Sequence, residues 1–401
     1  MKREKEISNN ILYKVRCKIN SENTGLSRTG LFEAIALEAV EYKLPPRVTA
    51  RISNRIFAKI KYRLGILEPY IEDESINEIM VNGPENIFIE RCGEIIKVDE
   101  VFDSVEELED VIRKIASDVH REINEMNPIV DARLMNGSRV NGVYKNIAIG
   151  GPILTIRKFS RDRITLTEMV EHGTVSSQCA EFLKRLVESG YNIFISGGTS
   201  SGKTTFLNAL SDYIPKEERV IVIEDSMELK ITNIPNIVRM ECRNANSMGK
   251  GSVEMDSLIK SSLRMRPDRI VVGEVRGKEV FQMIQAMNTG HKGSLSTGHG
   301  NSVMGMLRRL ESMYLMAYHI PIDAIRVQIV EALDVMVHLE KVPGGKRVVT
   351  EVVELIGYEN GSYLTNPIYL MDEKMSLKST ENELVNSKYL KYREFSNNDR
   401  L

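Results

Sequence analysis

The chain has 401 residues, 42% of them hydrophobic and 27% charged, which is ordinary for a soluble globular protein and long enough for two or three domains. Its four cysteines, Cys17, Cys92, Cys179 and Cys242, lie far apart without a C-x-x-C pair, which argues against a disulfide framework and a zinc site. No apolar run approaches the roughly 18 residues needed to span a bilayer, and no signal-peptide core follows the charged N-terminus. We therefore expect a cytoplasmic protein.

Charge is unevenly spread along the chain. The net charge is −2, but residues 1–63 hold 14 Lys and Arg against 6 Asp and Glu. A basic segment of this kind suits an acidic partner such as lipid headgroups, with peripheral contact at the inner face of the cell membrane. A solvated basic helical face is the commoner explanation and needs no partner.

The N-terminal region divides into a tail and two helices. Residues 1–27 are polar and lack a clear apolar period, which predicts a flexible tail. Residues 28–64 form a predicted helical extension, because apolar residues recur at helical spacing on both sides of Pro45-Pro46. Both helices are expected to contribute to a core.

Residues 65–158 are predicted to form a small α/β domain. Strands are expected at 76–84 and 86–91, joined by an Asn-Gly-Pro turn, and a helix at 106–116 is opened by Ser104. Further strands are expected around residues 130–134, 138–143 and 153–159. The polar residues 159–164 are predicted to be a linker.

Residues 165–358 alternate predicted strands and helices, which is typical of an α/β domain with a largely parallel sheet. A strand at 347–357 is expected to finish that sheet. Residues 359–401 are predicted to be a C-terminal tail, and its charged, apolar-poor end is predicted to be disordered.

The most informative motif runs from Gly197 to Thr204 and fills every position of the phosphate-loop pattern G-x-x-x-x-G-K-[ST]. A predicted strand precedes it and a predicted helix follows, so backbone N–H groups and a helix N-terminus are aimed at a β-phosphate. Lys203 is expected to reach the β- and γ-phosphates, and Thr204 to place its hydroxyl on Mg²⁺. The expected ATP-binding residues are Gly197, Gly198, Thr199, Ser200, Ser201, Gly202, Lys203, Thr204 and Thr205.

Carboxylates end two predicted strands. One strand ends in Glu224 and Asp225, and another in Gly273 and Glu274, where most phosphate-loop enzymes carry an aspartate at the position of Gly273. Open α/β sheets bind ligands at the carboxyl ends of their strands. Glu224, Asp225 and Glu274 are therefore, with Thr204, the candidate Mg²⁺ ligands, and Glu274 is the candidate for polarising the attacking water.

Other interpretations of these acids and of two nearby histidines stay open. The acids can instead cap the following helix or pair with Arg276 or Arg243. His291 and His299 lie among glycine and hydroxyl residues, which predicts a tight turn where an imidazole reports on the γ-phosphate by hydrogen bonding. A zinc pair is the alternative, but no third ligand lies near in the sequence.

Together these blocks resemble the secretion-system ATPase superfamily of type II and type IV secretion and type IV pili. Its phosphate loop, Asp box (223–229), atypical Walker B motif (266–277) and His box (290–299) all have counterparts. Within it the chain is most similar to CpaF-type ATPases of tight-adherence (Tad/Flp) pilus assembly. That similarity rests on residues 79–84, 131–134, 137–141, 154–159, 263–268 and 286–291, and the resemblance as a whole covers roughly residues 64–358.

The resemblance implies a RecA-like phosphate-loop NTPase domain preceded by a small α/β (PAS-like) domain and a helical extension. It also implies a hexameric ring that hydrolyses ATP and an inner-membrane platform protein as partner. Arg133, Arg139 and Arg157 match arginines that meet the phosphates of ATP held between the two domains. His299 would act catalytically as a sensor of hydrolysis.

Some residues depart from the family pattern. Met135-Asn136 and residues 144–146 are unusual loop residues. Gly298 and Gly300 flank His299 where bulkier apolar or alanine residues are common, and we expect them to loosen the His box. The missing C-x-x-C pairs argue against the zinc-bearing type II secretion and pilus-extension relatives.

Two rival functions remain. One is a type IV secretion ATPase that moves effector protein or DNA, and the other is a nucleotide-gated scaffold with little turnover. A nucleic-acid helicase is disfavoured because the basic excess lies in the N-terminal helices and no aromatic-rich strand motif for stacking bases is present.

Overall fold

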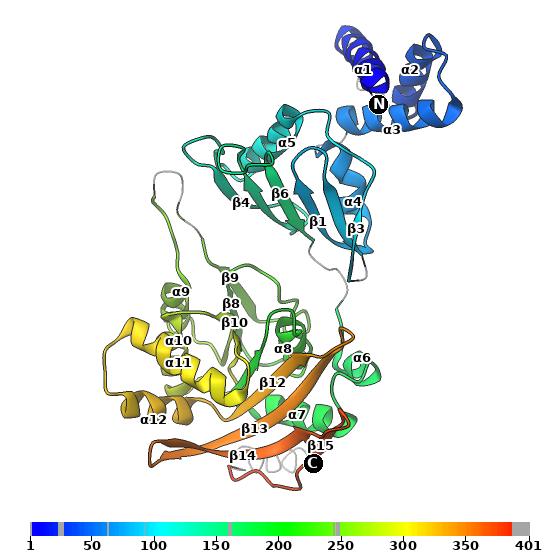
Figure 1. Ribbon diagram of the computed structural model, residues 1–401. Coiled ribbons are helices and arrows are strands. Elements are labelled where there is room, and N and C mark those ends of the chain that lie inside the picture. The colour runs from blue at the N-terminus through cyan, green and yellow to red at the C-terminus, as the bar shows by residue number, and fades with distance from the viewer. Residues whose placement is uncertain are drawn as a thin grey trace. The chain divides into compact units, whose positions relative to one another are not determined.

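The computed structural model describes residues 2–22, 28–61, 64–91, 93–158, 163–243, 245 and 249–386. The chain forms two compact units, Met1–Arg161 and Asp162–Leu401 (Figure 1). Most of the expected linker, residues 159–162, lies outside the described residues, as does the end of the expected C-terminal tail from residue 387.

The first unit begins with three helices, α1 (Lys2–Glu22), α2 (Arg28–Val40) and α3 (Pro46–Lys61). Helix α1 occupies most of the expected flexible tail, so that expectation is wrong for residues 2–22. Ile7, Ile11 and Val15 recur every four residues and are buried in a small core shared with α2 and α3. With the partly buried Leu12, these are the few apolar residues that α1 offers to the core, which makes them a weak signal in a polar sequence.

Part of the N-terminal positive charge is used within this unit. Lys59 pairs with both Asp103 and Glu107, and Arg55 donates to Asp103 at 2.6 Å. Lys18 similarly pairs with Glu38 of α2 at 2.5 Å. The pairs of Lys59 and Arg55 fasten α3 to the segment that opens helix α5, and the pair of Lys18 joins α1 to α2. All of them reduce the charge that the helices offer to an acidic partner.

The rest of the first unit's described residues contain a six-stranded antiparallel sheet and the helices that accompany it. The strand order is β3-β2-β1-β6-β5-β4. The elements are the short helices η1 (Gly65–Leu67) and α4 (Glu68–Glu72), strands β1 (Ile76–Asn82), β2 (Ile87–Arg91) and β3 (Glu94–Lys97), helix α5 (Val105–Asp118), and strands β4 (Ile129–Arg133), β5 (Arg139–Val143) and β6 (Ile153–Arg157). Ser104 caps α5 by accepting a hydrogen bond from the Glu107 amide. Helix α5 packs so closely on one sheet face that a Cβ at Gly142 would lie 2.8 Å from Ile112.

The second unit's described residues form a nine-stranded sheet in the order β15-β14-β13-β12-β7-β11-β10-β8-β9. The strands are β7 (Ile193–Gly197), β8 (Val220–Glu224), β9 (Ile237–Glu241), β10 (Arg269–Val275), β11 (Leu295–His299), β12 (Val335–Lys341), β13 (Arg347–Glu359), β14 (Ser362–Met371) and β15 (Leu377–Ser379). Strands β7 to β12 pair in parallel, as expected from the alternation of strands and helices. The last four strands of the chain pair antiparallel.

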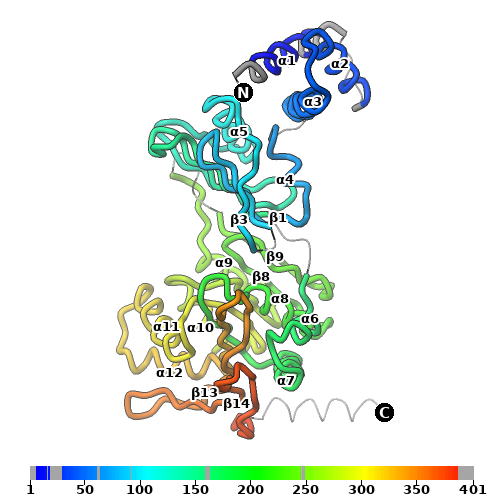
Figure 2. Tube along the Cα trace, turned by 45° about the vertical axis from the view of Figure 1, so that its right-hand side comes forward, coloured from blue at the N-terminus to red at the C-terminus, as the bar shows by residue number. Residues whose placement is uncertain are grey.

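Helices cover both faces of this sheet (Figure 2). Helices α6 (Leu166–Glu171), α7 (Ser177–Ser189) and α8 (Lys203–Ser211) share one core cluster. Helices α9 (Met255–Ser262), α10 (Glu279–Asn288), α11 (Val303–Ala317) and α12 (Ile322–Ala332) share the other. Along β7, Ile193 and Ile195 face the first cluster and Phe194 the second, which explains why this strand reads as a continuous apolar run.

The sheet continues past the point where the sequence predicts a tail. Strands β14 and β15 occupy residues that we expected to lie outside the domain, so its predicted end at residue 358 is wrong. The signal was an Asn360-Gly361 turn, in which both residues have the positive φ angles of a tight hairpin. The buried carboxylate of Glu354 then accepts hydrogen bonds from the amides of Val385 and Asn386, which fixes the described end of the chain.

Within the described part of the chain, no helix is long and apolar enough to cross a membrane.

Candidate functional site

The phosphate-loop pattern forms a strand, a tight loop and a helix, in the expected order. Strand β7 ends at Gly197, where a Cβ would lie 2.4 Å from the Leu339 carbonyl oxygen, so only glycine fits. Gly202 has a left-handed backbone (φ 92°) and caps helix α8, whose first residue is Lys203. The sharp return of the chain onto a helix N-terminus is the geometry that binds phosphate in other proteins.

The side chain of Lys203 lies inside this loop. Its Nζ donates to the carbonyl oxygens of Gly197 at 3.1 Å and Gly198 at 2.7 Å, and lies 3.2 Å from Nδ1 of His299. Lys203 is only 6% exposed, and this burial lowers the pKa of its ammonium group. An ammonium group at the mouth of a phosphate loop is the partner that a nucleotide phosphate requires.

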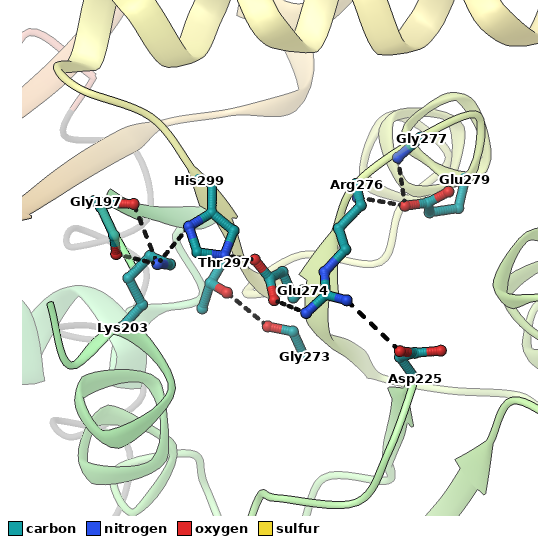
Figure 3. Close-up of polar contacts among 11 residues, drawn as sticks. Gly197, Lys203, Asp225, Gly273, Glu274, Arg276, Gly277, Glu279, Thr297 and His299 are labelled. Atoms are coloured by element: carbon teal, nitrogen blue, oxygen red, sulfur yellow. Dashed lines mark hydrogen bonds and ion pairs between the residues drawn. The ribbon is translucent and has the colours of Figure 1, made fainter. Parts of the chain in front are cut away.

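His299 connects Lys203 to Glu274 (Figure 3). Nδ1 faces the Lys203 ammonium and therefore accepts, which leaves the ring proton on Nε2, 2.7 Å from Oε1 of Glu274. Burial lowers the pKa of His299, so the ring is neutral near pH 7. His299 is the last residue of strand β11 and pairs with Gly197, so the expected tight turn is wrong for residues 295–299.

Glu274 lies near the carboxyl end of β10 and is held from two sides. Opposite His299, the guanidinium of Arg276 lies 2.7 Å from Oε2 of Glu274 and 3.7 Å from a carboxylate oxygen of Asp225. The alternative in which a local arginine pairs with these acids is therefore confirmed for Arg276. It is wrong for Arg243, whose Nε donates to the Gly251 carbonyl.

A continuous polar array thus joins the phosphate loop to the ends of three further strands, β11, β10 and β8 (Figure 3). Sequence reasoning treated Arg276 only as a competing partner for the acids, and missed it as a link between Glu274 and Asp225. Its position two residues after Glu274, at the end of a strand, was the available signal.

Glu224 has a different environment from Glu274. It ends strand β8 and is 4% exposed, and its Oε1 accepts from the amides of Glu228 at 2.8 Å and Leu229 at 3.0 Å. Burial raises the pKa of this carboxyl to about 7. One oxygen of Glu224 therefore organises the following loop, while Oε2 makes no hydrogen bond within the described residues.

Hard oxygen donors of the kind that Mg²⁺ prefers are present among the residues expected to hold it. Within the described residues, no three His, Cys, Asp or Glu side chains form a group that would hold a metal ion. Mg²⁺ commonly needs only one or two protein oxygens besides phosphates and waters. The Thr204 hydroxyl and Oε2 of Glu224 are suitable hard ligands, whereas Asp225 and Glu274 lie against Arg276.

The missing aspartate at position 273 has a steric explanation. A Cβ on Gly273 would lie 2.9 Å from Cγ of Glu224, closer than real Cβ contacts. The side chain of Glu224, from the neighbouring strand β8, thus fills the space into which an aspartate would project.

Gly273→Ala should accordingly destabilise the protein by about 1–3 kcal/mol through overpacking, measured as a lower thermal melting temperature. In a Glu224→Ala background the same substitution should cost much less, because the clashing Cγ is gone. Gly150→Ala, with no atom within 4 Å of the added Cβ, is the matched control. An equal loss from Gly273→Ala in both backgrounds would contradict the explanation.

Glu224 also predicts a dependence of stability on pH. Its pKa rises from an ordinary value near 4.5 to about 7 on folding, so between these values the folded state binds more protons than the unfolded chain. The free energy of unfolding should therefore fall as the pH rises through this window, by at most about 3 kcal/mol. Glu224→Gln should lose this dependence.

The test is urea unfolding of wild type and Glu224→Gln at pH 5 and pH 8, without nucleotide and with a chelator. The variant should gain stability relative to wild type at the higher pH. A constant difference between the two proteins would show that Glu224 titrates normally.

The three arginines predicted to meet phosphates come together in the first unit. In the strand register, Arg133 of β4 lies directly opposite Arg139 of β5, and Arg139 lies directly opposite Arg157 of β6. Directly opposite residues project from the same side of a sheet. Their buried neighbour Val140 packs in the core beneath α5, so the arginines form one row on the other face.

Other predicted features differ in the structure. Gly298 and Gly300 do not loosen the His box, because a Cβ at either would lie within 3 Å of Met306. His291 lies beyond the opposite end of β11 from His299, and its Nδ1 is 3.0 Å from the Ala286 carbonyl, so the two histidines are not a zinc pair.

The unusual loop residues also have contacts. Tyr144 is buried and accepts a hydrogen bond from Arg113 at 2.8 Å, and Lys145 lies 3.0 Å from the buried carboxylate of Glu109. Asn136 accepts from the Ser138 amide in its turn, and the Met135 side chain is exposed.

Comparison with known proteins shows the family to which the chain belongs. The model of the family "Type II/IV secretion system protein" matches residues 61–353. The chain belongs to this family. The matched range leaves out nearly all of α1 to α3 and ends within β13, before β14.

Relatives in this family include the conjugal transfer protein TrbB of Rhizobium radiobacter, 33% identical over 330 residues, which are 80% of this chain and 97% of TrbB. The uncharacterized protein MJ0781 of Methanocaldococcus jannaschii is 43% identical over 251 residues, or 60% of this chain. The match spans only 34% of MJ0781. The structure of the ATPase DotB of Legionella pneumophila aligns with a TM-score of 0.51 at 21% identity, covering 74% of this chain and 80% of that one.

Proposed function

We propose that this Type II/IV secretion family member is an ATPase that works as a hexameric ring and powers assembly of a Tad/Flp-type pilus. The ring would act at the inner face of the cell membrane, through a platform protein embedded there. The observation that carries the ATPase assignment is the array from Lys203 through His299 to Glu274, because it joins a phosphate-binding cation to a carboxylate at one edge of the sheet.

Each residue of the array has a role in this proposal. Lys203 binds the β- and γ-phosphates, which replace the Gly197 and Gly198 carbonyls as partners of its ammonium group. Thr204 and Glu224 would hold Mg²⁺, which supplies positive charge to the phosphate oxygens when bound. Glu274 polarises the attacking water, and His299 reports the loss of the γ-phosphate because it contacts both Lys203 and Glu274.

The arginine row is the second set of phosphate ligands. Arg133, Arg139 and Arg157 lie side by side on one face, as delocalised cations must to neutralise several phosphate oxygens together. Arginines stabilise the transferred phosphoryl group by factors on the order of 10³ or more in rate.

A second function is favoured by one comparison. TrbB is named a conjugal transfer protein, and its match covers 97% of TrbB, so the likeness is not confined to a shared nucleotide domain. The same ATPase would then move protein or DNA across the membrane instead of assembling pilin. Pilin and platform-protein genes beside this one would favour the pilus.

Phosphate release from ATP by the purified full-length protein tests the proposal, with Lys203→Ala as the inactive control. Size measurement with and without a non-hydrolysable ATP analogue tests whether a ring of six copies forms. Rings that bind ATP but release phosphate no faster than Lys203→Ala would reject the motor and favour a nucleotide-gated scaffold.

A further inference from the structure

One residue outside every recognised motif contacts the phosphate loop. Arg347 is the first residue of β13 and pairs with Lys341 at the turn end of the β12–β13 hairpin. Its Nε donates to the carbonyl oxygen of Ser200 at 3.0 Å. Its Cδ lies 3.2 Å from where a Cβ on Gly202 would be, so the stem of the side chain lies against the residue that caps α8.

The residue that Arg347 contacts has an unfavourable backbone conformation. Ser200 has a φ of 59°, in the left-handed region that favours glycine. A side chain at this φ crowds the following carbonyl group, so such a residue persists only where its surroundings hold it. Within the loop itself, the amide and hydroxyl of Ser201 donate back to the Gly198 carbonyl, whereas the Ser200 carbonyl accepts from Arg347.

The contact has no other evident structural purpose. Arg347 is exposed, and within the described residues its side chain makes no second hydrogen bond or ion pair. The one polar contact of this exposed arginine is therefore with the carbonyl group of a residue whose backbone conformation is unfavourable.

We propose that Arg347 is a positioning residue for the phosphate loop. Its bond to the Ser200 carbonyl holds the left-handed turn that directs the loop's N–H groups inward, before any nucleotide arrives. This inference rests on the proposed nucleotide site at Lys203. Arginine suits the task because Nε–H is fixed in the guanidinium plane, while the ammonium of lysine has no donor at that point of the chain.

The first test needs no nucleotide. Hydrogen–deuterium exchange of peptides covering residues 197–206 is compared among full-length wild type, Arg347→Ala and Lys341→Ala. Lys341 is the matched control, since it is an exposed cation on the same hairpin with no contact to the loop. We expect about five-fold faster exchange in Arg347→Ala alone, the scale of one lost hydrogen bond. Equal exchange in all three proteins would overturn the proposal.

The second test measures the Kd for ATP and the kcat. Arg347→Ala and Arg347→Lys should both raise the Kd about five-fold and leave kcat within about two-fold, since one positioning bond is lost and no catalytic group. Adding Ser200→Gly to Arg347→Ala should recover most of the affinity, because glycine adopts this φ without strain. Affinity retained by Arg347→Lys, or no recovery with Ser200→Gly, would show that Arg347 acts by charge or not at all.

The two tests separate the possible failures. If wild type and Lys203→Ala bind ATP equally poorly, the proposed function fails, and hydrogen exchange still decides whether Arg347 holds the loop. Thermal melting of each variant confirms that it is folded, and Arg347→Lys provides the measurement if Arg347→Ala melts early.

Discussion

Replacing Glu274 by glutamine should abolish ATP turnover and preserve nucleotide binding. Glutamine keeps the size of the side chain and still accepts a hydrogen bond from Arg276, but it cannot take a proton from water. A positioned general base contributes about 10²–10⁴ in rate, so phosphate release should fall by at least about 100-fold. The Kd for ATP should change little, because Lys203 and the loop are untouched.

Asp225→Asn is the matched control, because it removes a carboxylate from the other end of the same arginine. The Asp225 side chain is 60% exposed and 3.7 Å from Arg276, so its loss should change turnover only slightly. Normal phosphate release by Glu274→Gln would remove Glu274 from the catalytic role and leave it as an ion-pair partner of Arg276.

Arg269→Met should cause the largest loss of stability that we expect from one substitution. Arg269 is 2% exposed, and its guanidinium makes a bidentate ion pair with Glu218 and donates to the Val187 carbonyl at 2.5 Å. These bonds join the starts of β8 and β10 to the end of α7. Methionine leaves the carbonyl and the carboxylate unpaired, a cost of about 3 kcal/mol.

In a unit of this size that cost should lower the melting temperature of the second unit by about 6–12 °C, measured by calorimetry. Arg269→Lys should also lose most of the stability, since an ammonium group cannot make the bidentate pair. Arg264→Met, at an exposed position in the turn that precedes β10, should change stability by less than about 0.5 kcal/mol. Equal melting of Arg264→Met and Arg269→Met would refute the structural role.

Much of the fold could be predicted because its signals are local. The phosphate loop, the strands before Glu224 and Glu274, and the cap at Ser104 each follow from a few adjacent residues. The prediction for residues 2–22 was wrong because α1 offers few apolar residues to the core. The prediction for β14 was wrong because the turn at Asn360-Gly361 was overlooked. These errors concern the ends of the chain and leave the site intact.

The site was predictable in its members but not in its connections. Sequence pattern placed Glu224 and Glu274 at strand ends, but it did not show how each carboxylate is held. Their difference depends on neighbours: the amides of the following loop bind Glu224, while Glu274 is held by His299 of β11 and by Arg276, two residues further along the chain. Arg347 lies 147 residues from Ser200, and no local pattern connects them.

The contacts of Gly298 and Gly300 with Met306 have a mechanical consequence. Because both glycines leave no free space, the end of strand β11 and the first turns of helix α11 must move as one part. His299 lies between these two glycines. A displacement of α11 along the sheet should therefore also displace the imidazole of His299. In the same way, a displacement of the imidazole should move the fifteen-residue helix.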